Sequence, residues 1–556
     1  MYHNLIKRIP MLFILLLVAA SLVACVEKSP DETASTTEDG KTVISLGRVT
    51  APNPKLPEGD TYEDNAYTRL VEKELDVDIR DAFEAEGEDY DRQVALAISS
   101  GDLPDMMRVN SVEELKELVE NDLIADLSDV YEKNANDYIK GIYDSYDGRP
   151  LGDATFDGRL MAIPATVGGN APNLVWIRQD WLDQLGLEID SDGDSLLTLE
   201  ELEKTAKAFI ENDPGGSGNP VGIPFVYWLN AGDYGGSAFA MTSIASVFDA
   251  HPRQYYKNGN GEIVYGSTTE GTKKALGVMR EWFEKGIIDP QFGTRTWDDI
   301  MALLTNGQAG IVTGPWHLPD WGLSAVKEMD KEAKFVAYTL EGDNEKVNVF
   351  HENPTAQFIV VRKGYEHPEL AMEILNLFYD DLANEKNLDS KYPEIAKYNE
   401  LGVDGSTRPF NMEVYSSTSQ LDDFRRVKSV VNGEIPMDDI VKPVIKADAQ
   451  SIMDYMDNPE NAETSSWSKY HSRMFGLGLI DQLTKEDKFK WTTPFYVGTT
   501  ETMEKKGANL LKLEEEDFIK IITGSEPLDY FDTFVKNWES QGGNEILTEV
   551  EEEITN

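Results

Sequence analysis

The segments TVISLG (42–47), VDI (77–79) and GDLPDMM (101–107) are short and rich in apolar residues. Two longer amphipathic segments, NAYTRLVEKEL (65–75) and YDRQVALAIS (90–99), lie between them. Short apolar runs bounded by turn residues are typical of buried strands, and apolar residues spaced three or four apart are typical of helices. Strands that alternate with helices of this length predict parallel βαβ units and an α/β fold.

The chain is long and strongly acidic. It has 556 residues, and 51 Lys and Arg against 101 Asp and Glu give a formal net charge of −50. At roughly 150 residues per domain, this length predicts two or three domains, or two large lobes. Hydrophobic residues make up 40% of the chain, which suffices for a buried core and excludes a wholly disordered polyanion. The charge excludes nucleic acids and bare anionic bilayers as partners, because like charges repel.

The scarcity of cysteine and histidine excludes several kinds of site. The chain has 1 Cys, so no intramolecular disulfide forms, and its 6 His include no pair at zinc-ligand spacing. The sequence also has no Gly-x-Ser-x-Gly motif and no phosphate-binding P-loop. No motif therefore argues for an enzyme.

The first residues have the features of a targeting segment. Basic residues precede an apolar run over 9–20, which is too short to span a bilayer comfortably. The following Leu-Val-Ala-Cys at 22–25 resembles the lipobox of bacterial lipoproteins. This resemblance implies a lipoprotein signal peptide over 1–24 and a lipid on Cys25. An ordinary signal peptide with an incidental Cys, or an anchor helix, is the alternative.

Residues 25–42 contain almost nothing to bury, which predicts a flexible tether. A coil of about 16 residues reaches roughly 20–24 Å. We therefore expect a folded body outside the cytoplasm, held at the extracellular face of the cell membrane by its N-terminal lipid.

A series of motifs along the chain suggests a family. In order they are GDLPD (101–105), LIADL (123–127), GRLMAIP (158–164), IRQDWLDQLG (177–186), LTNGQAGIVTGPW (304–316), FIKIITG (518–524) and FDTFVKNW (531–538). Together they resemble the bacterial extracellular solute-binding proteins of carbohydrate import, the maltose-binding-like class, and in particular its large Gram-positive lipoproteins. The resemblance covers nearly the whole mature chain.

This resemblance implies a type II periplasmic-binding-protein-like fold, in which two hinged α/β lobes hold a ligand cleft between them. Lobe one would comprise residues 43–165 and 350–405, and lobe two residues 166–349 and 406–556. The implied function is capture of a carbohydrate, for which we favour an oligosaccharide, and its delivery to the membrane subunits of an ABC importer. We expect a monomer that is not an enzyme.

Two other functions remain open from the sequence. A secreted glycoside hydrolase uses a pair of carboxylates on the same substrates, but with 101 acids in the chain such a pair carries no information. The other alternative is a binding protein of the same fold for a peptide or another solute, because fold does not determine ligand.

A pyranose has flat C–H faces and a rim of hydroxyls, so its site needs aromatic rings and planar polar groups. The foremost candidate is Trp316, which follows an apolar strand and Gly314-Pro315. In the class that the chain resembles, the Trp of a matching Gly-Pro-Trp lines the sugar cleft. A core Trp that closes this loop is the alternative. The further candidates for ligand binding are Trp228, Asp233, Asn110, Asn170, Trp467, Trp491 and Tyr415.

Each of these further candidates has a structural alternative. Trp228 and Asp233 follow another apolar strand, and Asn170 falls near the first crossing between lobes. Asn110 follows the 101–107 segment, but Val109 stands close to where the maltose-binding pattern has Trp. Packing is the favoured role for the last three candidates. Four other tryptophans lie in amphipathic patterns and are predicted to be core residues: Trp176, Trp181, Trp282 and Trp538.

The segment DSDGDSLLTLEE (190–201) matches an EF-hand calcium loop. Calcium prefers oxygen ligands. The loop offers them from the side chains of Asp190, Asp192, Asp194, Thr198 and Glu201 and from the carbonyl of Leu196. Ser195 stands at position 6, where such loops usually have glycine. We predict a structural calcium ion, and an acidic turn that caps the following helix is the alternative.

Overall fold

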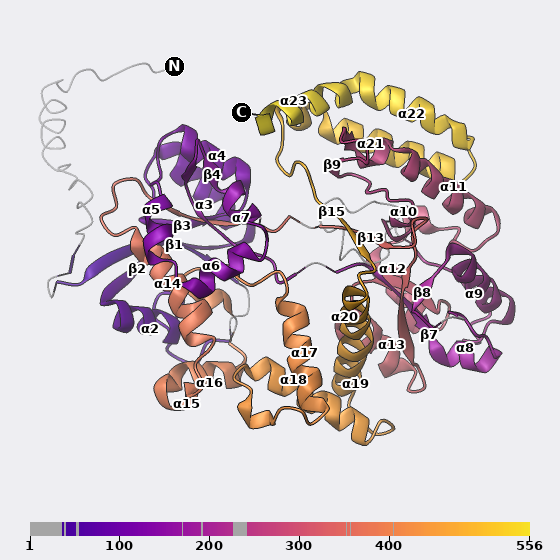
Figure 1. Ribbon diagram of the computed structural model, residues 1–556, viewed down its shortest axis with the longest axis horizontal. Coiled ribbons are helices and arrows are strands. Elements are labelled where there is room, and N and C mark those ends of the chain that lie inside the picture. Colours follow the sequence, from indigo (N-terminus) through magenta and orange to yellow (C-terminus); the bar gives the residue numbers. More distant parts are fainter. Residues whose placement is uncertain are drawn as a thin grey trace, which may run out of the picture.

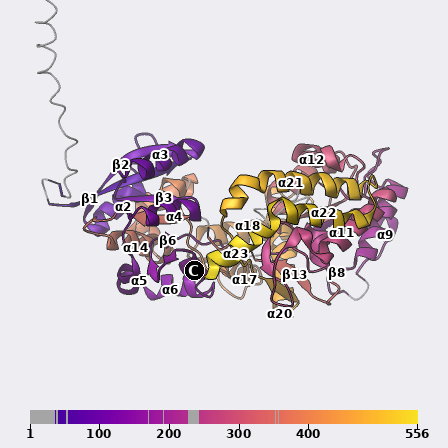
Figure 2. The same cartoon turned by 90° about the horizontal axis from the view of Figure 1, so that it is seen from above.

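The computed structural model describes residues 36–555, except 38–39, 52–54, 170, 191–192, 226–241, 352, 356 and 404. Two α/β bodies lie side by side, each built around its own main β-sheet (Figures 1 and 2). The first body holds the indigo and purple segments of Figure 1, and the second holds the magenta and yellow ones. The predicted α/β fold with two lobes is therefore confirmed.

The amino-terminal predictions fall largely outside the described residues. These are the signal peptide over 1–24, Cys25 and most of the tether. At the end of the tether Thr36 forms a β-bridge with Thr42, so the chain turns back before it enters the first strand. None of the helices in the described part of the chain combines the length and apolar character that a membrane span requires.

Lobe one is built on a five-stranded sheet with the strand order β2-β1-β3-β14-β6. Its strands are β1 (Thr42–Thr50), β2 (Val77–Glu86), β3 (Met106–Val109), β6 (Ile163–Pro164) and β14 (Phe358–Val361). β1 pairs in parallel with β2 and β3, and β14 is antiparallel to β3 and β6. The predicted strands at 42–47 and 77–79 are confirmed. The 101–107 segment is, as predicted, a turn that enters a buried strand: Gly101 ends the preceding helix in a left-handed conformation with φ 72°, and the strand begins at Met106.

Helices cover both faces of this sheet. Met106 and Met107 of β3 enter different cores, since alternate strand residues point to opposite faces. The helical elements on the Met106 side are α2 (Ala66–Leu75), α5 (Ser128–Asn134), α6 (Asp137–Asp144), α14 (Glu369–Asn376), η4 (Leu377–Leu382) and α16 (Pro393–Leu401). Those on the Met107 side are α3 (Gly87–Ser100) and α4 (Val112–Glu120). The remaining elements of this lobe are α7 (Arg149–Asp153), β4 (Thr155–Phe156), β5 (Arg159–Leu160), α15 (Leu388–Lys391) and η5 (Gly405–Thr407).

Lobe two has a four-stranded sheet with the order β11-β7-β12-β8. Its strands are β7 (Leu174–Arg178), β8 (Leu196–Leu197), β11 (Ile311–Gly314) and β12 (Phe335–Leu340). β7 is antiparallel to β11 and β12, and β8 is parallel to β12. Val175 and Ile177 enter one core of this lobe, whereas Leu174 and Trp176 enter the other. The sheet is therefore buried on both faces.

The helices of lobe two divide between these two cores. The core with Val175 is covered by α8 (Gln179–Leu185), α9 (Leu199–Asn212), α10 (Thr242–Val247), α11 (Glu270–Glu284) and the carboxyl-terminal α21 (Glu501–Ile522), α22 (Phe531–Trp538) and α23 (Asn544–Thr555). The core with Trp176 is covered by α12 (Trp297–Thr305), η3 (Pro319–Leu323), α13 (Ser324–Met329), α17 (Ser419–Val431), α19 (Thr464–Tyr470), η7 (His471–Leu477) and α20 (Gly478–Lys485). α18 (Pro443–Asp457) packs on α17 in a smaller cluster.

Two small strand pairs and several short turns complete lobe two. β13 (Val347–Phe350) pairs in parallel with β15 (Phe489–Thr492), and β9 (Tyr255–Lys257) pairs with β10 (Ile263–Tyr265). The short helical turns are η1 (Gly266–Thr268), η2 (Phe292–Thr294), η6 (Met437–Asp439), η8 (Leu528–Tyr530) and η9 (Glu539–Gly543).

Three segments connect the lobes, and they are hydrogen-bonded to one another. The first follows β6, the second precedes β14 and the third precedes α17. The N–H of Ala165 donates to the carbonyl of Gln357 at 2.8 Å, and the N–H of Thr166 donates to the carbonyl of Glu413 at 2.8 Å. The Thr166 hydroxyl also exchanges hydrogen bonds of 2.7 and 2.6 Å with the main chain of Tyr415. The lobes are thus joined along one narrow line, which suits a hinge.

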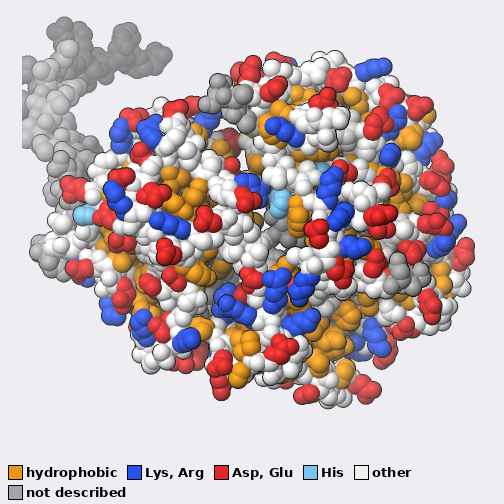
Figure 3. All heavy atoms as spheres, in the orientation of Figure 1, with side chains coloured by type: hydrophobic (Ala, Val, Ile, Leu, Met, Phe, Trp, Pro, Cys, Tyr) orange, Lys and Arg blue, Asp and Glu red, His pale blue; other side chains and the backbone are white. Residues whose placement is uncertain are grey.

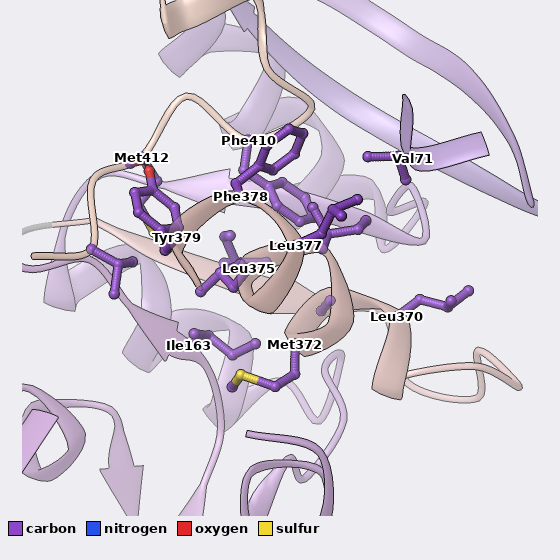
Figure 4. Close-up of a cluster of buried hydrophobic side chains, with 14 of the residues drawn as sticks. Val71, Ile163, Leu370, Met372, Leu375, Leu377, Phe378, Tyr379, Phe410 and Met412 are labelled. Atoms are coloured by element: carbon purple, nitrogen blue, oxygen red, sulfur yellow. Dashed lines mark hydrogen bonds between the residues drawn. The ribbon is translucent and has the colours of Figure 1, made fainter. Parts of the chain in front are cut away.

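The residue limits of the lobes stay a prediction. In the core of lobe one, Phe410 lies beside Phe378 and Met412 beside Tyr379 (Figure 4). Val414 belongs to the same core. These residues lie beyond 405, the predicted end of lobe one.

We predict that the buried His471 makes the protein less stable in acid. Burial in the core of lobe two lowers the pKa of His471 to about 4. Between that value and the ordinary pKa of about 6.5, the unfolded chain binds a proton at this position and the folded chain does not. The free energy of unfolding should therefore fall as the pH falls from 6.5 towards 4, by at most about 1.4 kcal/mol per pH unit from this residue.

Chemical denaturation at several pH values measures this slope. His471→Gln should flatten it, and the matched change His367→Gln, at a partly exposed position, should leave it unchanged. Equal slopes for the two variants would contradict the prediction.

Candidate functional site

The antiparallel pair of β7 and β11 determines where the candidate site lies. Gly314 at the end of β11 pairs with Leu174 at the start of β7. Because the chain enters β7 from the first crossing, the loop after β11 lies at the same edge of lobe two as that crossing. In the space-filling view the surface is hollowed between the two lobes (Figure 3). The loop after β11 carries the foremost candidate, Trp316.

Trp316 is half-buried and firmly held. The guanidinium carbon of Arg473 lies 5.0 Å from its ring centroid. Its main chain packs against Gly476, where a Cβ would come within 2.6 Å of the Trp316 carbonyl oxygen. The carbonyl of Pro315 accepts the indole N–H of the buried Trp176 at 3.2 Å. The loop is therefore fixed by the core beneath it, while part of the Trp316 indole stays exposed.

Two carboxylates hold the Arg473 guanidinium over Trp316. Its Nε donates to Asp448 Oδ2 at 2.9 Å, and its Nη1 donates to Asp320. Lys469 Nζ adds a second contact to Asp320 Oδ2, at 3.1 Å. The side chains of Arg473 and Asp448 are each 11% exposed. Their cation–π contact with Trp316 is thus part of a mostly buried ion network.

Three further aromatic rings continue from Trp316, and sequence reasoning missed their role. The centroid of the His317 ring lies 5.0 Å from that of Trp316 and 6.2 Å from that of Trp321. Trp321 stacks on Trp297 with centroids 4.9 Å apart, and its indole N–H donates to His317 Nδ1 at 2.9 Å. Trp297 and Trp321 are 38% and 41% exposed.

Trp491 lies on β15 beside the second crossing. Its ring is 38% exposed and stacks on the His351 ring at 4.6 Å. Burial, together with the positive charge of Arg149, lowers the pKa of His351 to about 4, so this ring is neutral at pH 7. Arg149 begins α7 of lobe one, and burial raises the pKa of the nearby Asp153 carboxyl to about 6. The positive charge of Arg149 in lobe one therefore acts on an aromatic pair at the second crossing.

Asn110 follows β3 at the crossing edge of lobe one. Its Nδ2 donates to Asp91 Oδ1 at 2.9 Å, and its main-chain N–H donates to Glu114 Oε2 at 2.7 Å. Its buried Oδ1 has no hydrogen-bond partner among the described residues. Asn110 therefore holds the start of α4 and retains one acceptor for a further polar group.

Of the remaining candidates that the structure describes, Trp467 lies away from this edge and Tyr415 lies on the third crossing. Trp467 is 1% exposed, lies in the core of lobe two and stacks on His471 at 4.2 Å, so it offers no surface to a sugar. Tyr415 lines a different cavity of about 720 Å³, between η4 and α16 of lobe one and α17 and α18. Trp228, Asp233 and Asn170 lie outside the described residues. Trp176, Trp181, Trp282 and Trp538 are buried as predicted.

The predicted calcium loop is described except for residues 191–192, so Asp192 lies outside. The Asp190 carboxylate accepts the main-chain N–H groups of residues 193–195 at 3.1, 3.0 and 3.1 Å. Ser195 has φ 64°, the left-handed conformation that favours glycine at position 6 of such loops. Ser195 therefore takes the left-handed conformation although the usual glycine is missing.

The end of this loop joins both the sheet and α9. The carbonyls of Ser195 and Leu197 accept N–H groups of β12 and of the residue after it, so the carbonyl of Leu196 points away from β12. Thr198 and Glu201 form a reciprocal cap at the start of α9. The capping alternative is therefore present in the structure too. Among the described residues, no cluster of three or more His, Cys, Asp or Glu side chains is arranged to hold a metal ion.

Comparison with known proteins identifies the family. The family model for bacterial extracellular solute-binding proteins matches residues 53–384. The chain belongs to this family. This confirms the resemblance drawn from the sequence motifs.

The chain is similar to several characterised or named bacterial proteins. The chain is 23% identical over 382 residues to Lipoprotein LipO of Bacillus subtilis, which covers 67% of each chain. It is 22% identical over 402 residues to the polygalacturonan/rhamnogalacturonan-binding protein YtcQ of B. subtilis, over 72% of this chain and 71% of that protein. It is 25% identical over 269 residues to the fructooligosaccharide ABC transporter substrate-binding protein FusA of Streptococcus pneumoniae, over 46% of this chain and 47% of that protein.

Solved structures share the fold of this family member. An EF-hand mutant of FusA from S. pneumoniae in complex with fructo-nystose is 16% identical, with a TM-score of 0.55 over 92% of this chain and 98% of that one. An extracellular solute-binding protein from Bifidobacterium longum subsp. infantis is 15% identical, with a TM-score of 0.59 over 93% of this chain and 98% of that one. At these identities the likeness concerns the fold alone.

We predict that Arg473 contributes strongly to the stability of lobe two. Arg473→Ala leaves the carboxylates of Asp448 and Asp320 largely buried without their main counter-charge, which should lower the free energy of unfolding by about 3 kcal/mol. Lys469→Ala removes a more exposed contact to the same Asp320 and should cost less than about 1 kcal/mol. Chemical denaturation measures both values, and equal costs would contradict the prediction.

Proposed function

We propose that this solute-binding protein is a lipid-anchored receptor at the extracellular face of the cell membrane. It captures an oligosaccharide between its lobes and delivers it to the membrane subunits of an ABC importer. The observation that carries the proposal is Trp316, a rigidly held and partly exposed indole at the crossing edge of lobe two. Two relatives support it, the fructooligosaccharide-binding FusA and the polygalacturonan/rhamnogalacturonan-binding YtcQ.

The chemistry of the two edges suits a sugar. On lobe two the rings of Trp316 and Trp491 offer apolar faces with a negative π surface for the C–H groups of a pyranose. On lobe one the half-buried Asn110 places a side-chain amide, a group that hydrogen-bonds hydroxyls, at the crossing edge. A ligand that contacts both lobes binds the closed form better, so it shifts the population from open to closed. The closed body then presents both lobes together to the importer.

The location in the cell follows from the amino terminus. In this proposal the signal peptide over 1–24 is removed and a lipid on Cys25 holds the protein at the membrane. The tether keeps the body within reach of a transporter in the same membrane. The body acts as a monomer, and it releases its ligand unchanged.

A glycan panel tests this function. Addition of a bound oligosaccharide should raise the melting temperature of the wild type, because a ligand that binds only the folded state stabilises it. Trp316→Ala should weaken binding by about tenfold or more, or ~1.4 kcal/mol, as measured by calorimetry. Tyr138→Ala removes an exposed aromatic ring on α6 and serves as the control, with no expected effect.

Mass spectrometry of the same mixtures separates the alternatives. Unchanged glycans together with a thermal shift support the receptor. Shortened glycans would instead show a hydrolase. A panel that produces no shift would contradict a carbohydrate function and favour a peptide or another solute.

We also propose that the loop over 190–201 binds a structural calcium ion. The carboxylates of Asp190, Asp192, Asp194 and Glu201, the hydroxyl of Thr198 and the carbonyl of Leu196 would hold it. The positive φ of Ser195 and the outward carbonyl of Leu196 support this assignment. A solved FusA structure is of an EF-hand mutant, which supports it further. The ion supplies positive charge among these acids and fixes the start of α9 to the sheet.

Calorimetry with calcium tests the loop. The wild type should bind with a Kd on the order of 10⁻⁴–10⁻³ M. Glu201→Gln should abolish this binding, although Gln also forms a helix cap, so α9 itself should persist. Glu200→Gln, at the adjacent exposed position, is the matched control and should bind normally. Absence of binding heat in the wild type, with the same melting temperature in EDTA, would contradict the assignment.

A further inference from the structure

The edge of lobe two carries more aromatic surface than Trp316 alone provides. From Trp316 a continuous row of rings passes through His317 to the stacked pair of Trp321 and Trp297. Each step in this row joins ring centroids that are 4.9 to 6.2 Å apart. The row therefore extends the aromatic surface of this edge beyond Trp316.

Chain topology explains why these rings meet. α12 leads into β11, so its last residues lie towards the start of that strand and its first residue, Trp297, lies towards the strand's end. Trp316 and η3 follow the end of β11 directly. Trp297 and Trp321 therefore reach the same edge of lobe two from segments on either side of one strand.

The row rests on a rigid support. α12 and η3 contribute to the same core of lobe two through Ile300, Leu303, Leu304 and Leu323. Gly322 beside Trp321 is buried, and a Cβ at this position would come within 2.8 Å of the Leu318 side chain. Trp321 is further oriented by its hydrogen bond to His317. Core packing beneath α12 and η3 therefore fixes the positions of the two indoles.

This pair is far more exposed than the five buried tryptophans of the described residues. Trp176, Trp181, Trp282, Trp467 and Trp538 are at most 3% exposed, whereas Trp297 and Trp321 are 38% and 41% exposed. Trp297 and Trp321 are only partly buried, so they contribute less stabilisation by apolar burial than the five buried tryptophans do. Two adjacent, rigidly held and partly exposed indoles leave apolar ring surface open to a ligand.

We infer that Trp321 and Trp297 form a second aromatic plate, which binds sugar units of the ligand beyond the unit at Trp316. This inference rests on the proposed function. It specifies the ligand as a chain long enough to extend from the Trp316 loop to the start of α12. Trp321 and Trp297 then act as determinants of chain length, because a single sugar unit at Trp316 does not reach them.

A sugar chain fits this plate better than a protein partner does. The plate is continuous with Trp316, the residue that carries the proposed binding site. Its surroundings are polar: Thr296 and Asp298 flank Trp297, and both are exposed. Two indoles in a polar setting form too small an apolar surface for a stable protein interface, whereas stacking on rings with a polar rim is what a pyranose requires.

The test compares affinities along ladders of defined oligosaccharides. Fructans, α-glucans and oligogalacturonides of two to six units are titrated by calorimetry, and the ladder that the wild type binds is carried forward. For the wild type, affinity should rise with length. Trp321→Ala and Trp297→Ala should each weaken binding of the longest member about tenfold, or ~1.4 kcal/mol, and leave the shortest bound member unaffected. Trp321→Phe keeps an aromatic ring, so its affinity should still rise with oligosaccharide length almost as much as that of the wild type.

Two controls make the outcome decisive. Trp316→Ala should weaken every member of the ladder, because all of them occupy the unit at Trp316. Light scattering with and without Trp321→Ala shows whether the plate instead mediates association of two copies. Equal losses for short and long members, no loss at all, or a change in oligomeric state would each overturn the inference while leaving the proposed function intact. If no ladder binds the wild type, both the inference and the proposed function fail.

Discussion

The side chain of Thr166 lies where the two lobes are joined, and the rest of the molecule depends on this junction. Its N–H reaches Glu413, and its hydroxyl both donates to and accepts from the main chain of Tyr415. Thr166 is 2% exposed, so these hydrogen bonds are protected from water. Because main-chain bonds tie the crossings to one another over only a few residues, they allow rotation of the lobes while preventing their separation.

The candidate ligand contacts lie on rigid parts of each lobe. Trp316, Trp321 and Trp297 all belong to segments that cover the same core of lobe two, and Asn110 holds the start of α4 in lobe one. A site of this kind changes shape when one lobe moves against the other, while the side chains keep their positions within each lobe. The strongly acidic composition suits a neutral ligand. A formal charge of −50 repels anions at long range and leaves a neutral polyhydroxylated ligand unaffected.

The sequence predicted the fold more completely than the site. Strand and helix periods in the first hundred residues were sufficient for the α/β architecture, since both are local patterns. Trp316 was found because the motif around it resembles a known one. Trp297 and Trp321 were missed because their pairing depends on the packing of α12 against η3, which no local pattern reports. Trp467 and Trp491 look alike in sequence, yet one is in the core and the other on an exposed strand.

The calcium loop shows the same limit in a different form. The spacing of its acids was visible in the sequence, and so was the departure at Ser195. Only the structure shows that Ser195 takes the left-handed conformation. It also shows that β8, within this loop, pairs with β12 of the main sheet, whereas an EF-hand loop usually pairs with a second such loop. The pairing of β8 with β12 joins residues more than a hundred positions apart along the chain, so no local pattern reports it.

Closure of the two lobes around a glycan is the central claim, and an interlobe distance measures it most directly. Labels at Tyr138→Cys on α6 and Leu511→Cys on α21 occupy exposed positions in different lobes. In a soluble form that begins after Cys25, double electron–electron resonance measures the distance between the two spin labels. The account predicts that a saturating glycan shortens this distance and narrows its distribution. An identical distribution with and without a glycan that calorimetry shows to be bound would contradict it.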